Sequence, residues 1–148
     1  MFPGKEEAVN TSTEGGCLCG RVRYRSTGES AATSLCHCRS CRRASGAPSV
    51  AWVVFRSADF AFLGDAPARF ASSPGVERTF CRNCGTPLTY QRTDEPETID
   101  VTTATLDTPE AFAPTREIWL EDRLSWERLN ETLPHYARTS RGATPIDD

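Results

Sequence analysis

Hydrophobic and polar residues alternate along much of the chain with the two-residue period that is typical of β-strands. In the segment RVRYR, Val22 and Tyr24 fall on one face. The other face carries Arg21, Arg23 and Arg25. This pattern predicts a half-buried strand whose arginines either form a solvated face or bind an anion.

Further segments are rich in the β-branched and aromatic residues that are favoured in strands. Residues 49–55 (SVAWVVF) are almost continuously apolar and predict a strand buried on both faces. Turn residues such as Gly64 and Gly75 separate the strand-like segments that follow, which are DFAFL, VERTF, PLTYQ and TIDVTT. Before Thr115 no window of a dozen residues shows a sustained helical period, so we expect a mainly β protein.

Helical structure is expected in only two places. Residues 39–44 predict one or two turns of helix that Gly46 ends in a left-handed conformation. The segment REIWLEDRLSWERL fits a strand or a helix, and we favour a strand at 117–120 followed by an irregular or helical turn.

The chain has 148 residues, which is the size of one domain. We predict a flexible leader at 1–14, a folded domain at 15–138 and a disordered polar tail at 139–148. No stretch approaches the roughly 18 apolar residues of a membrane helix, and no signal-peptide core is visible, so we expect a cytoplasmic protein. The net charge of −3 disfavours nucleic acid as a partner, whereas a homo-oligomer is compatible with the sequence.

Seven cysteines occur in CxC, CxCxxC and CxxC groups. An odd number leaves one thiol over in a disulfide framework, and cysteines two residues apart cannot bridge each other without strain. In a reducing cytosol, clustered cysteines bind metal more often than they form disulfides. We therefore interpret them as metal ligands, and specifically as ligands of zinc, which thiolates suit.

Spacing divides the cysteines into two sites. Cys36, Cys38 and Cys41 lie close enough in the chain to wrap one ion by themselves. The remaining four then pair into a closed structural site that fastens early and middle strands together: Cys17, Cys19, Cys81 and Cys84. Structural zinc usually has four protein ligands and catalytic zinc commonly has three, so the three-cysteine site is the candidate catalytic site. Two zinc ions are expected, and the second site can be partly occupied.

A three-thiolate ion is a weaker Lewis acid than one held by neutral imidazoles, so it suits a soft ligand such as an incoming thiol. Nearby Arg39, Arg42 and Arg43 either compensate the thiolate charge or bind the carboxylates of an anionic thiol. His37 lies between two ligands, and we expect its ring to project away from the metal. We expect His135 to be a surface or satisfied core residue.

Three segments closely resemble the glutathione-dependent formaldehyde-activating enzyme family, also called GFA or CENP-V-like: GGCLCGRVRY, CHCRSCRRASGA and FCRNCGTPLTY. The resemblance extends over about 15–136. It implies a mainly β fold of the Mss4-like or β-tent kind, the same division of structural and catalytic zinc ligands, and condensation of glutathione with formaldehyde, classed as carbon–sulfur lyase chemistry. Many members carry a histidine where this chain has Glu117, which bears on the identity of the substrate.

Three functions fit these residues. The first is an enzyme that adds the sulfur of glutathione or a similar thiol to a small aldehyde, or reverses that addition. The second is a noncatalytic zinc module that binds protein or nucleic acid. The third is a thiol-based metal or redox sensor, because an open three-thiolate site can lose its metal and oxidise.

Overall fold

The computed structural model describes residues 12–147. Within this range the chain is mainly β, as the sequence predicts, with ten strands, one α-helix, α2 (Arg39–Ser45), and several short 3₁₀ helices. In chain order the strands are β1 (Thr13–Gly16), β2 (Val22–Ser26), β3 (Ala32–Cys36), β4 (Val50–Arg56), β5 (Phe60–Gly64), β6 (Ala68–Ser73), β7 (Val76–Phe80), β8 (Pro87–Arg92), β9 (Thr98–Thr102) and β10 (Glu117–Ile118).

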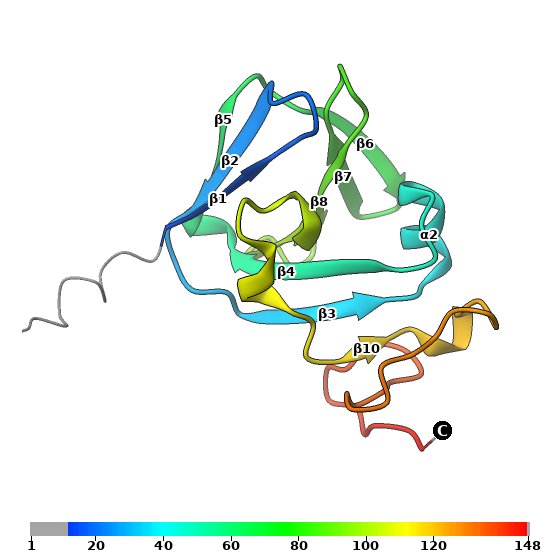
Figure 1. Ribbon diagram of the computed structural model, residues 1–148. Helices are drawn as coiled ribbons and strands as arrows, with labels where there is room; N and C mark the ends of the chain where they lie inside the picture. The colour runs from blue at the N-terminus through cyan, green and yellow to red at the C-terminus, as the bar shows by residue number, and fades with distance from the viewer. Residues whose placement is uncertain (1–11, 148) are drawn as a thin grey trace, which may run out of the picture.

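The strands form two sheets (Figure 1). The smaller sheet has the order β1-β2-β5 and is antiparallel. The larger sheet has the order β10-β3-β4-β9-β8-β7-β6, and its pairs are antiparallel except for β10 with β3. β10 and the chain after it lie beside β3, at the opposite side of the molecule from the smaller sheet (Figure 1).

The two faces of the larger sheet have different roles. Val53 and Phe55 of β4 are fully buried, and they join Val101 of β9 in a hydrophobic core that includes Val22 and Tyr24 of the smaller sheet. Because neighbouring residues of a strand point to opposite faces, the residues between them line the other face of the sheet. That face forms the floor of a cavity described below.

The smaller sheet is closely packed at β1. Gly15 pairs with Tyr24, and a Cβ atom at Gly15 would lie 2.3 Å from the Tyr24 hydroxyl. The Tyr24 hydroxyl instead forms a hydrogen bond of 2.7 Å with Thr105 Oγ1, which fixes the loop after β9 against β1. A glycine is therefore required at position 15 for the sheet and this loop to meet.

Helix α2 begins at the predicted residue, extends one residue beyond the predicted end, and is ended by Gly46 as predicted. The Cys38 sulfur accepts a hydrogen bond of 3.2 Å from the Cys41 amide and caps the first turn. Gly46 has φ of 72° and its amide donates to the Arg42 carbonyl oxygen. Only glycine adopts this left-handed conformation without a steric cost, so it ends the helix.

The strand predictions are confirmed for RVRYR, SVAWVVF, DFAFL, VERTF, PLTYQ and TIDVTT. One face of β4 is only half-buried, because Val54 lines the cavity. The strand expected at 117–120 is too long: it ends at Ile118, since Trp119 has φ of 60° and starts the 3₁₀ helix Leu120–Asp122. A left-handed residue cannot continue a strand.

The ends of the predicted domain also have defined neighbours. Residues 1–11 of the leader lie outside the described residues, while Thr13 and Glu14 belong to β1. In the predicted tail, Ser140 accepts a hydrogen bond from Arg116, and Arg141 forms an ion pair with Glu95. In the described part of the chain, no helix is both long enough and apolar enough to cross a membrane.

The two-faced sheet leads to a stability prediction for adjacent residues of β4. Val53→Ala removes two methyl groups from the core between the sheets and should lower the free energy of unfolding by about 2 kcal/mol. Val54→Ala, on the cavity face, should cost less than about 1 kcal/mol. Urea denaturation of both variants measures the difference, and equal costs would contradict the assignment of the two faces.

Candidate metal centres

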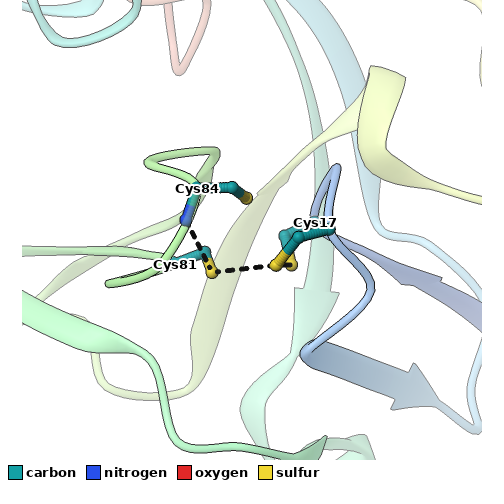
Figure 2. A group of neighbouring side chains, drawn as sticks. Cys17, Cys81 and Cys84 are labelled. Atoms are coloured by element: carbon teal, nitrogen blue, oxygen red, sulfur yellow. Dashed lines mark hydrogen bonds between the residues drawn. The ribbon is translucent and has the colours of Figure 1, made fainter.

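The first cluster of sulfur atoms joins the two sheets. Cys17 and Cys19 lie in the loop between β1 and β2, and Cys81 and Cys84 lie in the turn between β7 and β8. Their four sulfur atoms lie within 4.8 Å of one another. Figure 2 shows Cys17, Cys81 and Cys84 with their sulfurs turned toward a common point. The sequence predicts this group of four cysteines. The structure adds that the two pairs come from different sheets.

The sulfur spacing fits a tetrahedral metal ion. Cys17 and Cys19 have their sulfurs 3.6 Å apart, and those of Cys19 and Cys81 are 3.8 Å apart. An ion with zinc–sulfur bonds of about 2.3 Å holds tetrahedral sulfurs roughly 3.8 Å apart. The four-cysteine group can therefore hold a metal ion with no change of fold.

Backbone amides donate hydrogen bonds to the sulfurs of Cys17 and Cys81. The Val22 amide donates to the Cys17 sulfur at 3.3 Å, and the Cys84 amide donates to the Cys81 sulfur at 3.4 Å. Hydrogen bonds from Thr86 lower the pKa of the Cys84 thiol to about 5. Donors directed at a sulfur stabilise its anion, which is the form that binds metal.

The second cluster is local in the chain. Cys36 is the last residue of β3, Cys38 is the N-cap of α2, and Cys41 lies in the helix. Their sulfurs lie within 4.8 Å of one another, with Cys36 and Cys41 at 3.6 Å. Among the described residues no further cysteine, histidine or carboxylate joins this group. Three sulfurs leave one position of a tetrahedral ion for another ligand.

The three thiols of this cluster have unequal proton affinities. Hydrogen bonds from Cys36 and Cys41 lower the pKa of the Cys38 thiol. Hydrogen bonds with Cys38 and Cys41, together with burial, raise the pKa of the Cys36 thiol. The three sulfurs are close enough for the protonation of each thiol to depend on the other two.

His37 does not join the sulfurs, as expected from its place between two of them. It is fully buried, and its Nε2 lies 2.6 Å from Oε1 of Glu117, which is also fully buried. The other carboxylate oxygen of Glu117 accepts a hydrogen bond from the Asn130 amide. His135 is a buried core residue whose Nε2 forms a hydrogen bond of 2.9 Å with the Asn130 carbonyl oxygen.

Glu117 therefore has a structural contact with the cysteine loop. It occupies β10, where it pairs with Leu35 next to Cys36. The His37 amide also donates to the Ile118 carbonyl oxygen at 3.0 Å. The strand β10 and the Glu117 side chain together hold the loop that carries the three cysteines. Nothing in the sequence pattern indicates this contact, because it joins residues 80 positions apart.

A cavity of about 710 Å³ opens beside the three-cysteine group. Its lining includes all three cysteines and the aromatic side chains of Trp52, Tyr90 and Trp119. The Trp52 and Tyr90 rings are in contact, with centroids 6.0 Å apart. The volume exceeds that needed by a tripeptide-sized ligand, and mixed aromatic and polar walls are typical of small-molecule sites.

Charged residues of the cavity come mainly from segments distant from the cysteines. Of the arginines singled out in the sequence, Arg39 lines the cavity, whereas Arg42 and Arg43 are not among the lining residues. Four other arginines line it: Arg78, Arg92, Arg116 and Arg141. The strand pattern of VERTF gives Arg78 a definite face, but only the pairing of β7 with β8 shows that this face is the cavity.

Asp100 lies on the cavity floor between Val54 and Tyr90, its partners on the adjacent strands. Burial raises the pKa of its carboxyl group to about 7, and the opposing charge of Arg141 limits that rise. Near neutral pH this group is therefore only partly ionised.

The buried Glu117 leads to a second stability prediction. Glu117→Ala would leave His37 and the Asn130 amide without their partner, so it should lower the free energy of unfolding by about 3 kcal/mol or more. Glu121→Ala, which removes an exposed partner of Arg138 in the neighbouring 3₁₀ helix, should cost less than about 1 kcal/mol. Thermal or urea unfolding of the pair provides the measurement, and similar stabilities would contradict a structural role for Glu117.

Comparisons with known proteins show the family of this chain. The sequence model of the glutathione-dependent formaldehyde-activating enzymes matches residues 12–122. An uncharacterized lyase of Schizosaccharomyces pombe is 33% identical over 81 residues, which are 55% of this chain and 58% of that protein. The chain thus matches little more than half the length of this curated relative. The crystal structure of a Rhodobacter sphaeroides protein has 28% identity and a TM-score of 0.54, and the match covers 64% of this chain and 87% of that one.

The matched range of the family includes all seven cysteines and most of the described chain, so this chain belongs to the glutathione-dependent formaldehyde-activating enzyme family.

Proposed function

We propose that the chain is a zinc-dependent enzyme of the carbon–sulfur lyase type, acting on adducts between glutathione, or a similar thiol, and a small aldehyde such as formaldehyde. The observation that carries this proposal is a three-sulfur group without a fourth protein ligand among the described residues, opening into a cavity of about 710 Å³. Its family and its lyase-named relative support the same class of reaction.

Each sulfur group would have its own role. Cys36, Cys38 and Cys41 would hold the catalytic zinc, which supplies a positive charge that favours the thiolate form of a bound thiol. Cys17, Cys19, Cys81 and Cys84 would hold a structural zinc that the protein closes completely. All seven cysteines are free thiols in the structure. Free, clustered thiols suit a reducing compartment, and we place the protein in the cytoplasm.

The protein's own residues would orient the thiol and exclude water. In the synthetic direction the substrate thiol loses its proton and its sulfur forms a bond to the aldehyde carbon. The π electrons of the carbonyl group move to its oxygen, which takes up a proton and becomes a hydroxyl group. The reverse direction breaks the carbon–sulfur bond and the O–H bond, re-forms the carbonyl group of the aldehyde, and returns the proton to the sulfur of the released thiol. Trp52, Tyr90 and Trp119 give the cavity apolar walls, which lower the local dielectric around the reacting thiolate.

A noncatalytic zinc module would need the three-sulfur group only for folding. The cavity argues against that role, because a purely structural site gains nothing from an opening at the sulfur atoms. The described residues offer this group three ligands, whereas the four-cysteine group has the full number for a closed site.

Metal content should separate the two groups. Cys81→Ser breaks the site that joins the sheets and should give insoluble protein or a much lower melting temperature, since a structural zinc site can contribute about 10–16 kcal/mol. Cys38→Ser should stay folded and lose only the ion of the three-cysteine group. Zinc per chain and thermal unfolding provide the readouts. A Cys81→Ser variant with wild-type stability and wild-type zinc would contradict the division.

The proposed reaction can be measured by NMR exchange spectroscopy on an equilibrium mixture of glutathione and formaldehyde. Wild-type protein should accelerate the exchange between free and hydroxymethylated glutathione, and Cys38→Ser should return it to the uncatalysed rate. Arg69→Gln, which changes an exposed ion pair with Glu77, serves as the matched surface variant. If wild type and Cys38→Ser give the same exchange rate, the enzyme proposal is wrong and the zinc module becomes the better explanation.

A further inference from the structure

Two of the five arginines that line the cavity differ from the other three. Arg78 and Arg116 are half-buried, whereas the remaining three are exposed. Arg92 is paired with Asp94, and Arg141 is paired with Glu95. Among the described residues Arg39, Arg78 and Arg116 form no ion pair with a carboxylate, and of these three only Arg39 is exposed. The charge of Arg78 also acts on Asp100 at longer range.

Neutral groups hold both half-buried guanidinium groups in place. Arg78 donates from Nε to the Ser72 hydroxyl at 3.2 Å and stacks 5.0 Å above the Tyr90 ring. Arg116 donates to the Ser140 and Thr115 hydroxyls at 3.3 and 3.4 Å. These contacts fix the guanidinium positions without neutralising them, so most of their N–H donors stay available for an anion.

The two arginines lie on opposite sides of the three-cysteine group. Arg116 directly precedes β10, and its carbonyl oxygen accepts from the Leu35 amide at 2.9 Å, one residue before Cys36. Arg78 lies on β7, and the ring it covers, Tyr90, packs against the cluster formed by Cys36, Cys41 and Trp52. A thiol bound at the sulfur group would thus have one guanidinium on each side.

The sheet order gives the scale of this separation. Five strand-to-strand steps separate β10 from β7. At about 4.8 Å a step they span about 24 Å along a flat sheet. Both arginines line the same cavity of about 710 Å³, so their side chains face one shared space. Asp100 lies on the floor between the two strands, and the negative charge of its ionised form disfavours an anion there. The cavity therefore accepts negative charge at its ends rather than at its centre.

We propose that Arg78 and Arg116 are the specificity-determining residues of the cavity, each binding one carboxylate of an extended thiol that carries a carboxylate near either end. This inference rests on the proposed function and defines its thiol substrate. Glutathione has this form, since its two carboxylates lie at opposite ends of the molecule with the thiol between them. Compact thiols with a single carboxylate, such as free cysteine, can engage only one of the two arginines.

The test measures the affinity of the zinc-loaded full chain for glutathione. Calorimetry and the fluorescence of Trp52 and Trp119, which line the cavity, report the binding. Arg78→Gln and Arg116→Gln should each weaken glutathione binding about 10- to 100-fold, the value expected for losing hydrogen bonds to a charged group. Arg56→Gln, at a surface arginine with 70% of its side chain exposed, should bind glutathione like wild type.

Glutathione monoethyl ester, which lacks the glycine carboxylate, assigns the two ends. One of the two glutamine variants should bind the ester as well as wild type binds it, because the carboxylate that this arginine binds is already blocked. The other variant should keep its full loss. Glutathione affinities within twofold of wild type in both variants, or no detectable binding to wild type, would overturn the inference. So would equal losses for glutathione and its ester in both variants.

Two measurements keep the inference separate from folding and from the proposed reaction. Melting temperature and zinc content identify any glutamine variant that is misfolded or has lost its metal. In that case Arg78→Lys or Arg116→Lys is measured instead. The loss of glutathione affinity should then be smaller, because lysine keeps the positive charge but cannot form a bidentate contact. If glutathione binds as expected but aldehyde exchange is not accelerated, the proposed reaction fails and the inference stands. If exchange is accelerated and the arginine variants keep wild-type affinity, the inference fails alone.

Discussion

Four sulfur atoms gathered from two sheets are the constraint on which the rest of the molecule depends. Cys17 and Cys19 come from the smaller sheet, and Cys81 and Cys84 come from a turn of the larger one. Four thiolates within 4.8 Å repel one another strongly unless a cation lies between them. An ion bound there would fix how the sheets face each other around the hydrophobic core that they share.

The larger sheet converts this arrangement into a site. One face of β4 and β9 supplies the core, so those strands cannot move without disturbing the packing of Val53 and Val101. Their other face carries Trp52 and Asp100 into the cavity. The cavity floor is thus backed by the packed core on the other face of the same strands. β10 and Glu117 add a second support, because they hold the loop with the three cysteines from the far side of β3.

Local patterns predicted much of this structure. Alternation located most strands, Gly46 located the end of α2, and cysteine spacing divided the sulfurs into groups that the structure brings together. Long-range pairing decided the rest. Trp119 ended the last strand early through a left-handed backbone, and Glu117 reached His37 across 80 positions. Arg42 and Arg43 stood out because they are near the cysteines in sequence, whereas strand register placed Arg78 on the cavity.

The order of the cysteines along the chain also has a consequence during synthesis. The three-cysteine group is complete within six residues, so it can capture a metal ion as soon as Cys41 leaves the ribosome. Cys19 and Cys81 are 62 positions apart in the chain. At a synthesis rate of about 5–20 residues per second, Cys81 and Cys84 are made several seconds after Cys17 and Cys19. In a nascent chain the three-cysteine group can therefore bind a metal ion before the four-cysteine group is complete, and the thiols of Cys17 and Cys19 stay free to oxidise until then.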